Sequence, residues 1–382
     1  MLNIDIIYII INLLLFLVFI SAGLKISNGE NYRGNAILCV VVFTLALGLR
    51  YARGNDYLHY QDIYVHGYDE GSQLAFSFIN ESFKFIGVSK YGIFIVYSFI
   101  EIVCSLIFLR RYRQYAQYMF PLFLIAVIVF DEYQIRQALG FSFVFLCLDS
   151  LTDIPEKWYR AIRKNLKPIL RVIIYFTIAY SIHSACGYML VIMIGFFLFY
   201  KRTIPLIISI PALLFSAYFF SEWFDFGWLN PILSQFAGED ERMSTYLEDS
   251  DVWFSAKGQD DKYVRNPYVL AAEMFGTISL YILGSKVINK YVKRADAFAM
   301  YNFFVIGTII LNAFRTLELL NRIGGDFAMF WFFPLTLVLY YRKKLYTNFF
   351  YKVISVFLLW YVYDYLKYLF MKGEMTKFIW DV

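Results

Sequence analysis

The sequence has few charged residues and few residues of the kinds that bind metals. Asp, Glu, Lys and Arg make up 17% of the 382 residues, whereas soluble proteins carry about 25%. There are only three histidines and four cysteines, without a CxxC or HExxH pattern. The cysteines lie in or beside apolar stretches, as small buried side chains do: Cys39, Cys104, Cys147 and Cys186. These shortages argue against a soluble multidomain protein and against a metal centre, and we expect no cofactor.

Long apolar runs are abundant instead, and the mean hydropathy is +0.55. Windows of about 16–22 residues lie near 5–24, 35–50, 91–109, 116–131, 137–151, 169–183, 184–200, 203–220, 266–285, 296–313, 326–341 and 349–367. They predict an all-α fold, a polytopic membrane bundle of about twelve transmembrane helices forming one domain over 1–382. The first run has no basic segment or small-x-small cleavage site, so we expect a retained helix rather than a signal peptide.

The basic residues indicate how this bundle is oriented. Connections rich in Lys and Arg alternate with the others and would share one side, which the positive-inside rule makes cytoplasmic: 25–34, 110–115, 152–168, 201–202, 286–295 and 342–348. Both termini and the remaining connections, including the long ones at 51–90 and 221–265, would face outward. The net charge of +5 therefore reflects topology rather than a nucleic-acid-binding surface.

The outward basic residues nearest the membrane are nearly all arginines: Arg50, Arg53, Arg136, Arg242, Arg265, Arg315 and Arg322. The positive-inside rule disfavours these positions, so something other than topology should keep them there. Arginine binds phosphate and carboxylate through a planar fork of donors, and the group therefore predicts an anionic ligand. In the alternative interpretation the arginines pair with lipid head groups or with nearby carboxylates: Asp56, Glu132, Glu318 and Asp326.

Polar side chains accompany the arginines at two short outward connections. Gln134 and Gln137 flank Arg136 and would supply hydrogen-bond donors to an anionic or carbohydrate ligand. A salt bridge from Arg136 to Glu132 is the alternative. His183 lies between two apolar runs on the same side, where it is either a functional group or a capping and packing residue.

Three further segments on the outward side also lead to predictions. Residues 72–86 place Leu74, Phe78 and Phe85 at roughly helical spacing, which predicts an amphipathic helix along the outer interface. The 221–265 loop mixes aromatic residues with carboxylates, as sugar-binding surfaces and ordinary acidic loops both do. Arg315 and Arg322 are seven residues apart and would share one helix face, with Gly324-Gly325 breaking or loosening the helix before the next span.

In the order of these segments the chain resembles the EpsG-like branch of the Wzy-type bacterial polysaccharide polymerases. Members typically show Arg-x-x-x-Gly-x-Asp-Tyr-x-x-Tyr after the second span, which here runs from Arg50 to Tyr60. A Glu-led stretch, an Ile-Arg-Gln turn, a His-x-Ser-Ala helix start and an Arg-Ile pair follow, matched by Glu70, Ile135-Arg136-Gln137, His183-Ser184-Ala185 and Arg322-Ile323. The histidine element is contracted here, and Gly71 follows Glu70 where proline is frequent.

The resemblance implies an inverting, metal-independent glycosyltransferase with the C-type membrane architecture, in the bacterial inner membrane with its active site facing the periplasm. It would transfer a growing glycan from undecaprenyl pyrophosphate onto a lipid-linked repeat unit, making O-antigen, lipopolysaccharide, capsule or exopolysaccharide. Its partners would be lipid-linked glycans, the bilayer, and a chain-length regulator and flippase, without nucleic acid.

The resemblance also suggests a role for each residue. The leaving pyrophosphate would be bound by Arg136 and Arg322, then by Arg50, Arg53 and Arg315. The base would be His183 or Asp56. Substrate contacts would come from Gln134, Gln137, Tyr57, Tyr60, Glu70, Glu318 and Asp326, the last two also being reserve bases. The alternatives are a lipid-linked oligosaccharide flippase or transporter, expected to show related halves and midplane polar groups, and an O-antigen-type ligase, which differs only in acceptor.

Overall fold

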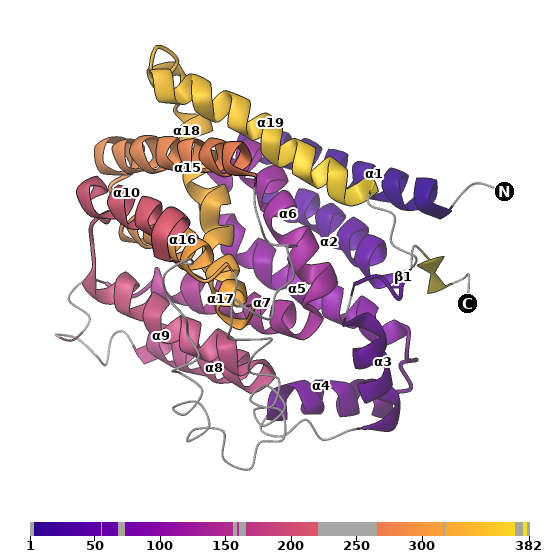
Figure 1. Ribbon diagram of the computed structural model, residues 1–382. Helices are drawn as coiled ribbons and strands as arrows, with labels where there is room; N and C mark the ends of the chain where they lie inside the picture. Colours follow the sequence, from indigo (N-terminus) through magenta and orange to yellow (C-terminus); the bar gives the residue numbers. More distant parts are fainter. Residues whose placement is uncertain are drawn as a thin grey trace. The chain divides into compact units, whose positions relative to one another are not determined.

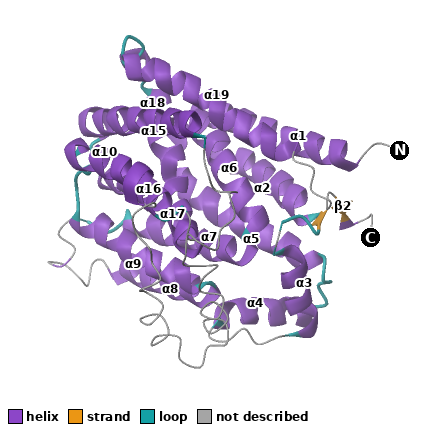
Figure 2. Cartoon of the chain, viewed as in Figure 1, coloured by secondary structure: helices purple, strands orange, loops and turns teal. Residues whose placement is uncertain are grey.

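The computed structural model describes residues 4–54, 56–67, 73–155, 159, 166–220, 266–315, 318–370 and 377–379. Nearly all of these residues are helical (Figures 1 and 2). The chain forms two compact units: Met1–Tyr200 with Leu358–Val382, called unit 1 below, and Lys201–Phe357, called unit 2.

Among its described residues, unit 1 contains a two-stranded sheet and ten helices that lie entirely within the unit. The elements are α1 (Ile4–Ser27), α2 (Tyr32–Gly48), β1 (Arg50–Tyr51), α3 (Tyr57–His66), α4 (Leu74–Phe85), α5 (Gly92–Leu109), a 3₁₀ turn (Arg110–Tyr115), α6 (Ala116–Tyr133), α7 (Ile135–Leu151), α8 (Leu166–Ile182), α9 (Ser184–Phe199) and β2 (Lys377–Phe378). Helix α1 packs between α2 and α6, and α7 lies along α8 (Figure 1). The predicted interfacial helix at 72–86 is present as α4, with Leu74, Phe78 and Phe85 exposed.

Single residues with non-helical backbone separate two pairs of helices in unit 1. Gln134 (φ −122°, ψ 54°) lies between α6 and α7, and His183 (φ −150°, ψ 116°) lies between α8 and α9. Because each break is one residue long, Arg136 belongs to the first turn of α7 rather than to a loop. These breaks place polar residues at helix starts inside an otherwise apolar bundle.

A short antiparallel sheet joins the chain after α2 to the C-terminal segment. Arg50 pairs with Phe378 and Tyr51 with Lys377, and the Ile379 N–H donates to the Leu49 carbonyl at 3.0 Å. The sequence gives no sign of this pairing, because two-residue strands carry no measurable periodicity.

Helices are also the only regular secondary structure among the described residues of unit 2. Its elements are α10 (Leu206–Phe215), a π-helical turn (Ser216–Phe220), α15 (Pro267–Val287), a second π-helical turn (Ile288–Val292), α16 (Ala295–Ala313), α17 (Glu318–Ala328), 3₁₀ turns (Met329–Trp331 and Arg342–Lys344) and α18 (Phe332–Tyr340). Helix α19 (Phe349–Phe370) supplies residues to both units. Asn266 caps α15 by accepting from the Tyr268 N–H at 2.9 Å, and Pro267 occupies the first helical position.

Two expectations about the stretch from Arg315 to Gly325 are wrong. Helix α16 ends at Ala313, so Arg315 lies outside α16 and α17 and shares no helix face with Arg322. Helix α17 continues through Gly324-Gly325 instead of breaking. The reason is close antiparallel packing: a Cβ on Gly324 would lie 2.5 Å from the Leu311 nitrogen, and one on Gly307 would lie 2.0 Å from the Ala328 nitrogen. Glycine here permits contact between two helix backbones.

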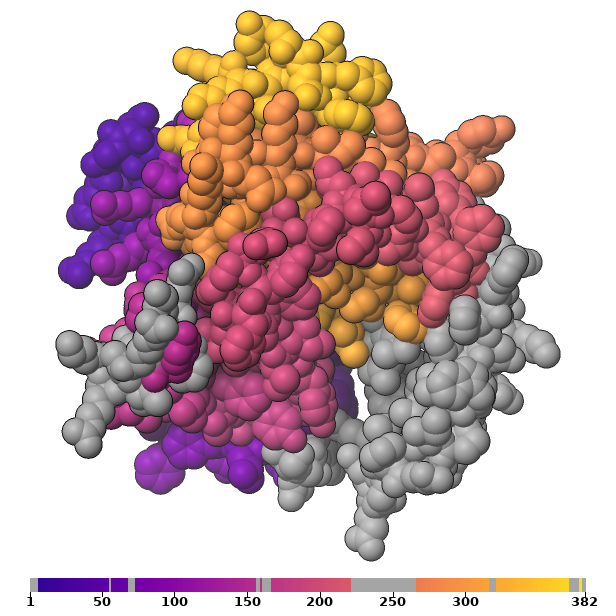
Figure 3. All heavy atoms as spheres, turned by 90° about the vertical axis from the view of Figure 1, so that its left-hand side faces the viewer, coloured from indigo at the N-terminus to yellow at the C-terminus, as the bar shows by residue number. Residues whose placement is uncertain are grey.

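Every predicted apolar window coincides with helical structure. Among the described residues, six segments are long and apolar enough to cross a membrane: Ile6–Ser27, Gly92–Tyr133, Pro267–Val292, Ala295–Ala313, Asn321–Tyr340 and Phe349–Phe370. Shorter apolar helices accompany them, and large apolar side chains such as Ile173 and Val191 are exposed on α8 and α9, magenta in Figure 3. The protein is therefore a multi-pass membrane protein. A total of twelve crossings stays a prediction, as does the single bundle over 1–382.

Gly54 is the position where the fold most needs a glycine. Its φ is +88°, and a Cβ there would lie 2.1 Å from the Glu132 carbonyl oxygen. The preceding Ala52 also has a positive φ of 51°. The chain after β1 therefore turns through two left-handed residues and lies directly against the end of α6, which brings Arg53 to Glu132.

We predict that Gly54→Ala destabilises the protein more than the same change at Gly29 or Gly87. All three glycines have positive φ, but nothing lies within 4 Å of a Cβ at Gly29 or Gly87. In the two control variants the free energy of unfolding should fall by about 1–2 kcal/mol, because alanine is strained in the left-handed backbone conformation. Gly54→Ala should lose more, because its Cβ also clashes with the Glu132 carbonyl oxygen. Thermal unfolding in detergent measures the difference, and equal losses at the three positions would show that the contact with Glu132 is unimportant.

Candidate functional site

The Arg53 guanidinium in unit 1 is held by a carboxylate and by two aromatic rings. Arg53 Nε donates to Glu132 Oε2 at 3.0 Å, and the Tyr8 hydroxyl donates to Glu132 Oε1 at 2.7 Å. The guanidinium also lies over the rings of Tyr8 and Tyr368, 3.8 Å and 5.2 Å from their centroids. Burial alone would lower the pKa of Arg53, but the carboxylate of Glu132 raises it above its ordinary value, so Arg53 stays charged. Arg53 therefore forms an ion pair with Glu132, one of the nearby carboxylates named as possible partners in the sequence analysis.

Arg50 lies in a different environment although it is only three residues away. It is 2% exposed, and its guanidinium donates to the carbonyls of Leu47 and, at 3.1 Å, Asp131. Among the residues that the structure describes, no carboxylate lies within ion-pair distance of Arg50. Carbonyl partners satisfy the donors without neutralising the charge, so Arg50 contributes a fixed positive charge beside β1.

Tyr57, Tyr60 and Arg136 form an aromatic and cationic cluster with Phe76 and Phe94. The Tyr57 ring stacks on Phe94 with a centroid distance of 3.8 Å, and burial raises the pKa of Tyr57, which keeps its hydroxyl protonated. The Arg136 guanidinium, 7% exposed as a residue, lies over the rings of Tyr60 (5.5 Å) and Phe76 (5.8 Å). Helices α3, α4, α5 and α7 therefore meet around a buried guanidinium.

The polar residues at the two helix breaks lie on neighbouring elements. The Gln137 carbonyl accepts from Cys186 Sγ at 3.6 Å, and a Cβ on Gly140 would lie 3.4 Å from the His183 Cβ. Gln134 is half-buried, and its Oε1 has no hydrogen-bond partner among the described residues. The first turns of α7 and His183 thus belong to one polar region. Asp56 lies half-buried directly before α3, without a side-chain capping bond to that helix.

The other predicted site residues belong to unit 2 or lie outside the described residues. Arg315 is half-buried after α16, while Arg322 is exposed and Asp326 buried on α17. Glu318 begins α17, and its side chain lies outside the described part of the structure, as do Glu70, Arg242, Arg265 and the rest of the 221–265 loop.

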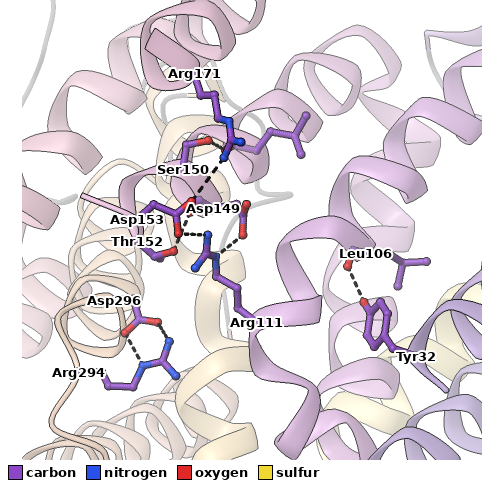
Figure 4. Close-up of polar contacts among 11 residues, drawn as sticks. Tyr32, Leu106, Arg111, Asp149, Ser150, Thr152, Asp153, Arg171, Arg294 and Asp296 are labelled. Carbon is purple, nitrogen blue, oxygen red and sulfur yellow. Dashed lines mark hydrogen bonds and ion pairs between the residues drawn. The ribbon is translucent and has the colours of Figure 1, made fainter. Parts of the chain in front are cut away.

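The opposite end of α7 carries a different kind of arginine cluster. Arg111 forms ion pairs with Asp149 and, at 2.7 Å, with Asp153, and Arg171 lies 3.6 Å from Asp153 (Figure 4). These side chains are partly exposed and their opposite charges are matched. Exposed pairs of this kind contribute little to stability and bind no further anion readily. The two ends of unit 1 therefore differ in how their arginine charges are balanced.

The sequence as a whole matches one family. A model described as the EpsG family covers residues 35–378, which include both helix breaks and the whole segment from Arg50 to Tyr60. The chain belongs to the EpsG family. No curated protein and no solved structure matches it. Membership supports a polymerase-like role in polysaccharide biosynthesis for this multi-pass EpsG protein.

Several residues that shape the EpsG site were not found from sequence. Tyr8 and Tyr368, which hold Arg53, are 360 positions apart in nearly uniform apolar helices, so nothing in their local sequence marks them. Asp131 was also missed, although a carboxylate at the end of an apolar run is a recognisable signal. A search for ionisable residues inside predicted spans, rather than in connections alone, would have found it.

We predict that Glu132→Gln lowers the free energy of unfolding by about 3–5 kcal/mol, because it leaves the Arg53 charge buried without its partner. The control is Asp62→Asn, which removes the exposed pair between Asp62 and His66 and should cost no more than about 0.5 kcal/mol. Denaturant titration in mixed micelles measures both.

The double variant Arg53→Gln with Glu132→Gln should lose less than the sum of the two single losses, since the pair is removed together. Additive losses would show that the Arg53 and Glu132 side chains do not stabilise the fold through each other.

Proposed function

We propose that this EpsG-family protein polymerises undecaprenyl-pyrophosphate-linked repeat units into a bacterial surface polysaccharide by inverting glycosyl transfer. The observation that carries the proposal is a buried group of arginines and tyrosines in unit 1, all within the residues that the family model matches: Arg50, Arg53, Tyr57, Tyr60 and Arg136. Guanidiniums held among aromatic rings offer charge for a phosphate and flat apolar faces for a sugar ring.

The reaction needs fixed positive charge beside the pyrophosphate leaving group. The acceptor hydroxyl attacks the anomeric carbon of the donor, the bond from that carbon to the pyrophosphate oxygen breaks, and the leaving group takes the electron pair. Negative charge then grows on the pyrophosphate, and preorganised guanidiniums stabilise it without reorganisation. A single displacement inverts the anomeric centre. In this proposal Arg136 and Arg50 contact the pyrophosphate, and Arg53 positions the loop through Glu132. Arg322 and Arg315 are the further candidates for pyrophosphate binding.

A base must take the proton from the acceptor hydroxyl. His183 and Asp56 are the proposed candidates, with Asp326 and Glu318 in reserve. Gln134, Gln137, Tyr57, Tyr60 and Glu70 would contact the sugars. The enzyme would work without metal or cofactor at the periplasmic face of the inner membrane, beside a flippase that supplies lipid-linked units and a regulator that sets chain length.

We predict that purified protein in detergent, given a matched lipid-pyrophosphate-linked repeat unit and a chelator, makes a glycan ladder on a gel. Arg136→Ala should reduce the rate by about 10²–10³, the cost of removing one group that stabilises transition-state charge, and Arg322→Ala should also reduce it. Arg33→Ala, at an exposed arginine next to the first residue of α2, is the control and should polymerise at the wild-type rate.

Wild-type rates in both Arg136→Ala and Arg322→Ala would contradict the assignment of these arginines. The absence of a ladder, combined with movement of the lipid across proteoliposomes, would overturn the polymerase proposal in favour of a flippase.

We predict that the base is identified by comparing His183→Gln with Asp56→Asn in the same assay. Removal of the true base should slow turnover by about 10²–10⁴ while substrate binding changes little. If His183 is the base, the wild-type rate falls as the pH drops, because a protonated imidazole cannot accept the proton. Two variants with equally small losses would exclude both residues as the base.

A further inference from the structure

One end of unit 2 brings together four chain segments that carry basic residues. They are 201–205 before α10, the last turn of α15 with the π-helical turn Ile288–Val292, residues 293–296 at the start of α16, and 341–348 after α18. Two asparagines tie the first of these segments to the next two. The Asn302 side chain of α16 accepts from the Ile204 N–H and donates to the Arg202 carbonyl, both at 2.8 Å. Asn289 of the π-helical turn donates to Thr203 Oγ1 at 2.8 Å.

Stacked tyrosine rings join the fourth segment to the π-helical turn. The rings of Tyr291 and Tyr341 lie 5.0 Å apart between centroids, at 16° to each other. The Lys344 ammonium lies over this pair, 4.4 Å from the centroid of Tyr291 and 5.6 Å from that of Tyr341. The Lys290 ammonium lies 5.4 Å from the same Tyr291 ring. Two ammonium groups from different elements are therefore held beside one aromatic ring.

Carboxylates do not balance the charge at this end of unit 2. The basic residues of the four segments are Lys201, Arg202, Lys286, Lys290, Lys293, Arg294, Arg342, Lys343 and Lys344. Asp296 is the only acidic residue in the same segments, and it is buried and accepts two bonds from Arg294, at 3.0 and 2.6 Å (Figure 4). Within the part of the chain that the structure describes, no carboxylate forms an ion pair with the five lysines from Lys286 to Lys344.

The basic cluster of unit 1 on the same predicted side is built differently, because Arg111 and Arg171 face the carboxylates of Asp149 and Asp153. Both clusters satisfy the positive-inside rule, which depends on the presence of Lys and Arg and not on their partners. Topology therefore explains why the lysines of unit 2 are on this side. It does not explain why two of them are held beside one ring without a carboxylate, since like charges at short range repel.

These lysines lie at the depth of lipid head groups. The candidate spans Pro267–Val292 and Asn321–Tyr340 end at this point of unit 2, and the span Ala295–Ala313 begins there. Tyrosine rings are enriched at the same depth, and basic pockets between spanning helices bind anionic head groups. Lys290 and Lys344 are exposed, so a lipid phosphate can reach both of them.

We propose that this end of unit 2 binds an anionic phospholipid of the adjacent leaflet through its phosphate. The Lys290 and Lys344 ammonium groups contact the phosphate, and the Tyr291 ring between them holds the two lysines in place. The bound phosphate replaces repulsion between two ammonium groups by attraction to both. In the predicted topology this leaflet is the cytoplasmic one, whereas the proposed glycosyl transfer takes place at the periplasmic face. The lipid site and the polymerase proposal can therefore fail separately.

The first experiment measures lipid binding to the purified protein by native mass spectrometry, with dioleoylphosphatidylglycerol as the anionic lipid and dioleoylphosphatidylcholine as the zwitterionic one. The wild-type protein should bind the anionic lipid more tightly. The double variant Lys290→Gln with Lys344→Gln should lose roughly 30-fold in affinity for it, the effect of two lysines near an anionic membrane surface. Equal affinities of the double variant and the wild-type protein for the anionic lipid would overturn the proposal.

The control is the double variant Lys25→Gln with Lys90→Gln. It also removes two exposed lysines, and Lys90 lies 5.1 Å from the ring of Tyr91, much as Lys290 lies beside Tyr291. This variant should bind the anionic lipid like the wild-type protein. A loss equal to that of the first double variant would show that total charge, and not this end of unit 2, selects the lipid.

The second experiment tests whether the ring positions the lysines. Tyr291→Phe keeps the ring and should keep the wild-type affinity, whereas Tyr291→Leu keeps every charge and should lose several-fold in affinity, because Lys344 is no longer held. Thermal unfolding in neutral detergent without lipid checks that both variants fold. Equal affinities in the two folded variants would refute a site built on Tyr291. If Tyr291→Leu does not fold, the lysine variants decide.

A competition experiment distinguishes a lipid from a soluble anion. Inorganic phosphate at millimolar concentration should leave most of the dioleoylphosphatidylglycerol bound to the wild-type protein, because the lipid is also held by its apolar chains. Complete displacement would mean that the site takes a free anion, and equal binding of the two lipids would mean that it does not select charge. Either result would overturn the proposal.

Discussion

The burial of the Arg53 charge is the constraint on which unit 1 depends. A guanidinium in an apolar bundle is tolerated only with a complete set of partners, and here Glu132 supplies the charge while Tyr8 and Tyr368 supply the aromatic faces. These partners come from α1, α6 and α19. The path of the chain before α3, and with it the place of Arg50, follows from this contact, and Gly54 is required because Glu132 lies directly against the backbone.

The arginines that face outward in the predicted topology are not one class. Arg53 is neutralised by a carboxylate, Arg50 donates to carbonyl groups, and Arg136 lies over two aromatic rings. A carboxylate cancels the charge of its arginine, whereas carbonyl dipoles and ring quadrupoles stabilise a cation without removing it. A count of arginines from sequence therefore overstates the number that can bind an anion, and the partners of each guanidinium decide its role.

The sequence predicted the helices well because long apolar runs have one stable solution in a membrane. The windows near 91–109 and 116–131 became α5 and α6 with nearly the predicted ends, and the amphipathic pattern at 72–86 became α4. Contacts between distant residues were not predictable: the pairing of Arg50 with Phe378 has no local signal. Gly324-Gly325 was misjudged because glycine both breaks helices and permits close helix packing, and only the neighbouring α16 decides between them.

The charges around Arg50 depend on which side chains Glu132 binds. Glu132 is adjacent to Asp131 in sequence, yet its two oxygens are taken by Arg53 and Tyr8, so it cannot also neutralise Arg50. Glu101 on α5 and Asp131 on α6 are also buried. Arg53 thus has a carboxylate partner, whereas the neighbouring Arg50 donates to backbone carbonyls. The partners of these two arginines at this end of unit 1 therefore differ although the residues are only three positions apart.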